Sequence, residues 1–125
     1  MKVLKTVFFL GIILFSKDAF SQYLPPSYQP MLSEIVTFFE TITSGNSLQK
    51  GETSIRVVNE NKIVLRIKHK GQIKNLTFET KPDEENKLVW MAANDLTIDM
   101  VNKYEDYLTK TFEDMHKLAE KKSKE

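Results

Sequence analysis

Apolar side chains recur every three or four positions in the segment that follows Pro30, and polar residues fill most positions between them. Pro30 itself suits the first turn of a helix, because a missing N–H there leaves no helical hydrogen bond unmade. Gly45 is of the residue type at which helices commonly end. The pattern therefore predicts an amphipathic helix of about four turns between these two residues. Its apolar stripe consists of Met31, Leu32, Ile35, Phe38, Phe39 and Ile42.

From residue 52 to residue 92 the apolar period changes to two, which is typical of β-strands. A tight two-residue turn at 70–71 sets His69 opposite Gln72. The resulting register gathers apolar residues on one face, and a loop at 59–61 brings the preceding strand into line with them. We therefore expect an antiparallel meander of four strands. Its core face consists of Ile55, Val57, Ile63, Leu65, Leu76 and Phe78.

A last strand at residues 88–92 precedes a second helical pattern. Asn94 or Asp95 can cap this helix, because both side chains accept hydrogen bonds from a first helical turn. A straight helix from Leu96 to Leu118 would be about 35 Å long, more than the sheet needs, so we expect its last turns to project. Its apolar stripe is formed by Val101, Tyr104, Leu108, Phe112 or Thr111, Met115 and Ala119.

The order of these segments predicts one α+β domain at residues 30–119. It has an N-terminal helix, a four-stranded antiparallel meander and a long C-terminal helix, in the order αββββα. Residues 22–29 contain Pro25 and Pro26, and we expect them to form an extended leader. Residues 120–125 are predicted to be a charged C-terminal tail.

The first 21 residues have the three-part pattern of a secretory signal peptide. Lys2 and Lys5 supply the positive charge, residues 7–15 supply the apolar segment, and Ala19 and Ser21 are the small residues before a cleavage site. The apolar segment is too short to cross a bilayer, which takes about 20 residues. We therefore predict a signal peptide at residues 1–21, cleaved after Ser21. The product is a secreted protein without a membrane span, extracellular or, in a Gram-negative bacterium, periplasmic.

The charge balance changes when this segment is removed. The whole chain of 125 residues carries +1, but residues 1–21 hold three lysines and one aspartate, so the remaining 104 residues carry −1. Because the charge is nearly balanced and no aromatic residues interleave with the lysines of the sheet, nucleic acid is disfavoured as a partner. The chain has no cysteine, so a secreted domain must be stabilised by packing without disulfides.

The candidate chemical groups indicate neither a metal site nor a catalytic centre. His69 falls at a predicted turn, and His116 has Glu113 and Glu120 within helical reach, but one histidine and two exposed carboxylates are an incomplete ligand set. Weak surface ion pairs are the simpler interpretation. The acidic loop at 83–85 lacks the ligand spacing of a calcium loop, and no nucleophile–base motif occurs. We therefore predict no metal, no cofactor and no enzymatic activity.

Six residues are candidates for a binding surface. If both helices cover the sheet face that carries Leu65, the opposite face exposes β-branched residues beside cations, and a partner protein or a second copy could dock there. If one helix lies on each face, the same apolar residues belong to the core. A solvated, charged face is the ordinary alternative. The candidates are Val58, Val64, Arg66, Lys68, Lys70 and Ile73, and Asn75 of the sequon Asn75-Leu76-Thr77 is a candidate glycosylation site on the same face.

These observations favour a small secreted, non-enzymatic binding protein that docks a protein partner or associates with itself. The alternative is a carrier that holds a small hydrophobic ligand between helices and sheet. Trp90, Met91, Met100 and Met115 could line such a space, although a packed core is the simpler interpretation of these four residues. A small secreted enzyme is the third hypothesis.

Overall fold

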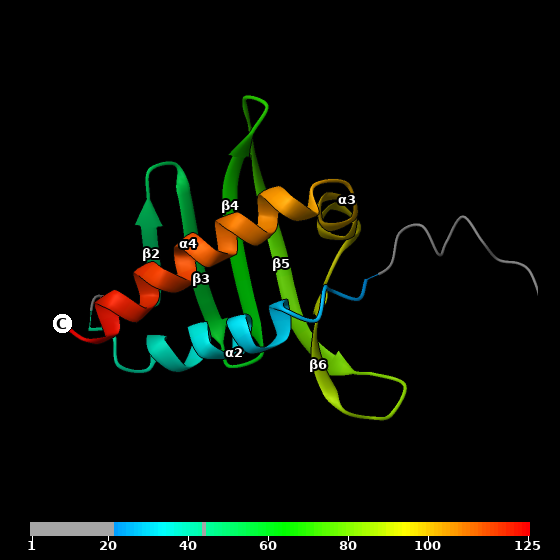
Figure 1. Cartoon of the computed structure of the whole chain (residues 1–125), viewed down its shortest axis with the longest axis horizontal. Coiled ribbons are helices and arrows are strands. Elements are labelled where there is room, and N and C mark those ends of the chain that lie inside the picture. The colour runs from blue at the N-terminus through cyan, green and yellow to red at the C-terminus, as the bar shows by residue number, and fades with distance from the viewer. Residues whose placement is uncertain (1–21, 44) are drawn as a thin grey trace, which may run out of the picture.

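The computed structural model describes residues 22–43 and 45–125, and the predicted signal peptide lies outside these residues. The fold is α+β, as predicted, and its sheet is antiparallel with the strand order β2-β3-β4-β5-β6 (Figure 1). The elements are α2 (Tyr28–Phe39), β2 (Ser47–Lys50), β3 (Thr53–Asn59), β4 (Lys62–His69), β5 (Gln72–Pro82), β6 (Leu88–Ala92), α3 (Asp95–Lys103) and α4 (Glu105–Ser123).

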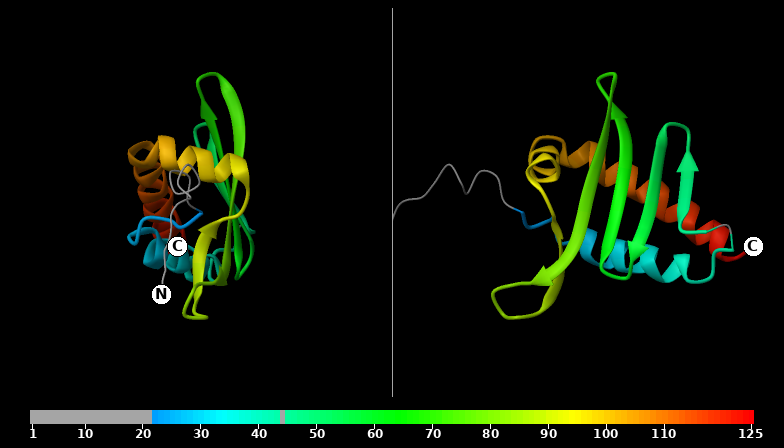
Figure 2. Two further views of the ribbon diagram at one scale, coloured as in Figure 1. Left: turned by 90° about the vertical axis from the view of Figure 1, so that its right-hand side faces the viewer. Right: turned by 180° about the vertical axis from the view of Figure 1, so that it is seen from behind.

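The molecule has two layers, with α2 and α4 side by side on the same face of the sheet (Figure 2). The short helix α3 packs against β5 and β6 at one end of this helical layer. Burial alternates along β4 as this arrangement requires: Ile63, Leu65 and Ile67 are buried, whereas Arg66 and Lys68 are exposed. Of the two arrangements considered for the helices, the structure therefore has both on one face.

The predicted register of the central hairpin is confirmed. His69 pairs with Gln72, and Leu65 pairs with Leu76. The turn between them has positive φ angles at both central residues, 52° at Lys70 and 78° at Gly71, as a type I′ turn requires. The pairing of Ile55 with Leu65 is likewise as predicted.

The turn between β3 and β4 differs from the predicted three-residue loop. Asn59 pairs with Lys62, so only two residues turn, and the register shifts at Val58. The extra residue is taken up inside β3 as a bulge, which leaves the pairing of Val57 with Ile63 unchanged.

The sheet has five strands. The prediction of four was wrong because it missed β2, which is only 4 residues long. Only Leu48 of this strand is buried, so its sequence shows no clear alternation. Gly51 has a φ of 62° at the first position of the turn that joins β2 to β3. The Val57 N–H extends the pairing by donating to the Asn46 carbonyl at 2.9 Å.

Helix α2 begins at Tyr28, two residues before the predicted start, and Pro30 lies in its first turn as expected. Tyr28 and Gln29, the last two residues of the predicted extended leader, are therefore helical, and Tyr28 is fully buried. Its ring meets Phe112 edge-on at 5.5 Å. The helix ends at Phe39, well before Gly45, although Ile42 still packs against the core.

The predicted C-terminal helix is two helices. Asn94 caps the first, as expected, by accepting from the Thr97 N–H at 2.9 Å. The chain leaves helical geometry at Tyr104, with φ −132° and ψ 43°, and α4 then crosses the sheet toward β2. The prediction of projecting last turns was wrong, because the break lets α3 pack on β5 and β6 while α4 buries Met115 and Ala119.

Candidate functional site

The side of the sheet that faces away from α2 and α4 is exposed along β3, β4 and the first half of β5, and we call it the open face (Figure 2). At β6 this side is covered, because Met91, which pairs with Glu79, is buried there. The open face exists because alternate residues of each strand point to opposite sides and one set packs under the helices. At its centre Arg56 pairs with Val64, and Arg66 pairs with both Ser54 and Asn75. The part of the open face formed by β3, β4 and β5 consists of Ser54, Arg56, Lys62, Val64, Arg66, Lys68, Ile73, Asn75, Thr77, Glu79 and Lys81, and Ser47 and Gln49 of β2 continue it.

Two lysines of the open face already have carboxylate partners. The Lys62 ammonium lies 3.6 Å from Glu79, and the Lys68 ammonium lies 3.2 Å from Glu52 in the turn that precedes β3. These pairs are largely solvated, and such pairs contribute at most about 1 kcal/mol to stability. Their main effect is to neutralise charge at two borders of the open face.

Arg56 and Arg66 differ from these lysines. Both side chains are exposed, and within the described part of the chain neither guanidinium has an ion pair or a hydrogen bond. They lie on adjacent strands, one diagonal step apart, because Arg56 pairs with Val64 and Arg66 is two residues further along β4. The centre of the open face therefore carries two adjacent cations whose donors face solvent.

Apolar side chains accompany the arginines. Ile73 is 55% exposed and pairs with Lys68, and Val58 is 38% exposed at the bulge of β3. Val64 is half-buried between Arg56 and Thr77. Ile73 lies near the tip of the β4–β5 hairpin, one pair from the turn. Together, the three β-branched residues place apolar surface beside the two arginines of the open face.

The structure brings together four of the six predicted binding residues, Val64, Arg66, Lys68 and Ile73, while Val58 lies at one border. Lys70 does not belong to this set. Its ammonium donates to the Tyr104 hydroxyl at 3.1 Å and lies 5.2 Å from the centre of that ring, on the side of the helices. The positive φ of the turn redirects this residue.

Sequence analysis missed Arg56. The signal was present, because Ile55 and Val57 were assigned to the core face, and strict alternation then places the residue between them on the other face. Its pairing with Val64 confirms that position.

Asn75 is exposed on the open face and lies directly opposite Arg66. Leu76, the middle residue of its sequon, is fully buried on the other side of the strand. The geometry leaves the Asn75 amide accessible, and its glycosylation stays a prediction.

The two histidines lie apart and have separate partners. The His116 Nε2 lies 2.7 Å from a Glu34 carboxylate oxygen, so its partner is on α2, whereas the sequence pointed to Glu113 and Glu120 of its own helix. The His69 ring packs against Tyr104 with ring centres 4.4 Å apart. Among residues 22–43 and 45–125, no group of three or more histidine, aspartate or glutamate side chains is placed to hold a metal ion.

The acidic loop at 83–85 is the connection between β5 and β6, as the hairpin interpretation predicts. The Asp83 carboxylate accepts from the Glu85 N–H at 2.8 Å and from the Lys87 N–H at 2.9 Å. Asn86 completes the turn with a φ of 63°. Since the carboxylate bonds to its own loop, its role there is to shape the turn.

Surface grooves lie on the helical side of the molecule. One, about 760 Å³, runs between the β2–β3 turn and α4 and includes Thr53, Tyr107 and Met115. Another, about 710 Å³, lies beside α2 and the β5–β6 loop and includes Trp90. A third, about 500 Å³, lies at the break between α3 and α4. Between the layers, Met100, Leu108 and Phe112 are almost completely covered by neighbouring atoms, so no ligand-sized space adjoins them.

None of the helices in the described ranges is long and apolar enough to cross a bilayer. No protein-family model, no curated protein and no solved structure matches the chain.

Proposed function

We propose that this chain is a small secreted, non-enzymatic binding protein that docks a protein partner on its open face. The observation that carries the proposal is the pair Arg56 and Arg66, two exposed guanidiniums without counter-ions, beside the exposed Ile73. Arginine together with apolar side chains is typical of the central part of protein interfaces. The neutralised lysines at the borders correspond to the polar rim of such an interface.

Export is supported by the pattern of residues 1–21. Gln22, the first residue after the predicted cut, already belongs to the fold, because its carbonyl accepts from the Ala92 N–H at 2.9 Å. Tyr23 continues this contact by bridging to Met91 of β6. Cleavage before Gln22 would therefore retain both of these contacts with β6. The product would be extracellular, or periplasmic in a Gram-negative bacterium.

The two other hypotheses have less support. A carrier needs space between helices and sheet, and there Trp90, Met100 and Met115 are buried in close packing. The fourth residue considered, Met91, is also buried but pairs with Glu79 on the other side of the sheet, so its assignment to this space was wrong. An enzyme needs a cluster of reacting groups, and the closest pair of titratable side chains described above, His116 with Glu34, joins two helices at the surface. The absence of metal, cofactor and catalysis stays a prediction.

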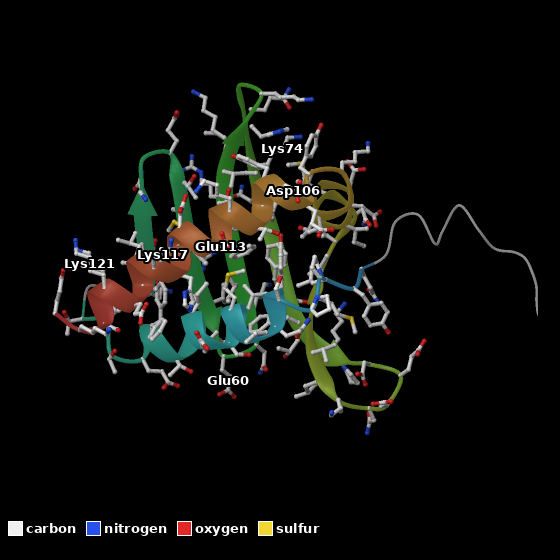
Figure 3. All side chains as sticks on the ribbon, in the orientation of Figure 1. Glu60, Lys74, Asp106, Glu113, Lys117 and Lys121 are labelled. Carbon is white, nitrogen blue, oxygen red and sulfur yellow. The ribbon has the colours of Figure 1, made fainter. Side chains whose placement is uncertain are left out.

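Site-specific photo-crosslinking tests the proposal. The chain is secreted by its own source with a photoreactive phenylalanine analogue at Asn75 on the open face, or at Lys117 on the outer side of α4 (Figure 3). Both positions are exposed, so the second is a matched control. We expect an adduct of one defined mass from position 75 and none from position 117. Equal adducts from both positions, or no adduct from position 75, would contradict the proposal.

A further inference from the structure

We propose that the open face binds an extended segment of its partner in which two acidic residues and one apolar residue alternate with other residues. The motif is acidic-x-acidic-x-apolar, and its contacts are Arg56, Arg66 and Ile73. This inference rests on the proposed function and specifies the chemistry of the partner.

The three residues lie on one straight diagonal across β3, β4 and β5. Arg56 pairs with Val64, and Arg66 is two positions beyond Val64 on β4. Arg66 pairs with Asn75, and Ile73 is two positions beyond Asn75 in the same direction, opposite Lys68. Each step from one residue to the next thus crosses one strand and advances two residues. Diagonal neighbours of this kind are about 7–8 Å apart in an antiparallel sheet.

An extended peptide has nearly the same spacing. Its side chains at positions i, i+2 and i+4 point to one side, about 6.6–6.8 Å apart. Two carboxylates at i and i+2 can therefore each meet one guanidinium, which binds a carboxylate through two parallel N–H donors. The third side chain, at i+4, then lies over Ile73, where an apolar group removes the exposed surface of that residue from water.

The charges around the diagonal favour a protein segment over a long polyanion. Lys62 and Lys68 are bound to Glu79 and Glu52, and these two carboxylates repel an evenly charged chain such as a sulfated polysaccharide. At the centre of this face, Arg56 and Arg66 have no anion among the described residues, whereas Lys81 lies at the border next to β6. Two separate carboxylates of a peptide can bind these two guanidiniums. A polyanion has no apolar side chain to place over Ile73.

Peptide titration by NMR tests the inference on the secreted protein. The first peptide is blocked at both ends and contains Glu-Thr-Glu-Thr-Val, and the second has the same composition in the order Glu-Glu-Thr-Thr-Val. In the second, an extended chain directs its carboxylates to opposite sides. We expect the first to bind at least tenfold more tightly and to shift amide signals of β3, β4 and β5.

Substitutions on the protein supply the controls. Arg56→Gln and Arg66→Gln should each weaken the first peptide about tenfold, the loss expected for one charged contact. Arg66→Lys, which keeps the charge and loses the two-pronged geometry, should also weaken binding. Lys117→Gln on the outer side of α4 should leave it unchanged. Equal binding of the two peptides, or no effect of either glutamine variant, would overturn the inference.

Heparin is the third probe. If it binds in preference to the first peptide and competes with it at Arg66, the open face takes a polyanion and the inference fails. Photo-crosslinking separates this failure from that of the proposed function. A partner crosslinked at position 75 through a segment without the motif overturns the inference alone, whereas peptide binding without any crosslinked partner counts against the proposed function alone.

Discussion

At the scale of single residues, the fold depends on which side of a strand each side chain occupies. Leu65 and Val64 are neighbours in β4, yet Leu65 is fully buried under the helices and Val64 is half-buried on the open face. Replacing Leu65 by Ala removes most of a buried side chain from a closely packed core. We expect Leu65→Ala to lower the free energy of unfolding by about 2–5 kcal/mol, measured by urea titration.

The adjacent position supplies the control for this prediction. Val64→Thr keeps the branched shape preferred in strands, so it should change the free energy of unfolding by less than about 1 kcal/mol. Equal losses for the two variants would mean that the two faces of β4 are equally buried, against the arrangement described above.

Tyr28 gives a prediction about pH. Burial raises the pKa of its hydroxyl above the ordinary value of 10.0, although the hydrogen bond from Thr109 lowers it. The folded protein therefore keeps this proton at a pH where the unfolded chain has lost it, so stability is intact below about pH 10 and falls as the pH rises further. We expect Tyr28→Phe to reduce this alkaline loss, measured by urea titration at pH 8 and pH 11. An identical loss in both proteins would show that Tyr28 ionises equally in both states.

At the scale of elements, the hairpin was predictable and the shorter features were not. The register of β4 and β5 follows from one tight turn, because Lys70 and Gly71 fix the partner of every residue before and after them. Strand β2 offered only Leu48 as a buried position, and a single apolar residue defines no period.

The break at Tyr104 shows why a helical pattern cannot reveal where a helix bends. Val101, Tyr104 and Leu108 continue the three-and-four spacing directly through it. The break comes from tertiary packing: α3 rests on β5 and β6, whereas α4 must cross to β2. The Leu108 N–H still donates to the Tyr104 carbonyl at 3.0 Å, so the break leaves this hydrogen bond in place.

The cap of α3 provides a prediction at this scale. The side-chain oxygen Oδ1 of Asn94 accepts from the Thr97 N–H at 2.9 Å and from the Thr97 hydroxyl at 2.8 Å. That hydroxyl in turn accepts from the Thr77 N–H of β5, so the cap links the helix to the sheet. We expect Asn94→Ala to lower the free energy of unfolding by about 1–2 kcal/mol in urea titration.

Asn94→Asp is the matched variant, because a carboxylate accepts the same two hydrogen bonds and suits the positive end of a helix. It should retain most of the stability of the original protein. If the alanine and aspartate variants were equally destabilised, the side-chain acceptor would not be the stabilising feature.

At the scale of the whole molecule, the arrangement of layers could not be settled from the sequence. The strand pattern identified two faces, but whether one or both would be covered depended on where the two helices packed. Four of the predicted binding residues share the open face because both helices lie on the other side. Arg56 completes the candidate site only once β3 is paired with β4.

Export of the chain leads to a prediction about its N-terminus. If residues 1–21 are a signal peptide, the exported protein should begin at Gln22 and contain 104 of the 125 residues. Sequencing of the N-terminus of protein purified from its own secretion measures this directly. Exported protein that still begins at Met1 would contradict the prediction of a signal peptide. An N-terminus a few residues from Gln22 would correct only the predicted cleavage site.

The central claim is that the open face is a binding surface, and the double variant Val64→Thr/Ile73→Thr tests it most directly. The measurement is the yield of the adduct crosslinked through Asn75, together with the melting temperature of the variant. Because both substituted residues are on the side away from the helices, we expect the adduct to be largely lost while the melting temperature changes by less than about 4 °C. A clear drop in melting temperature would place these residues in a core, and an unchanged adduct yield would contradict binding through this face.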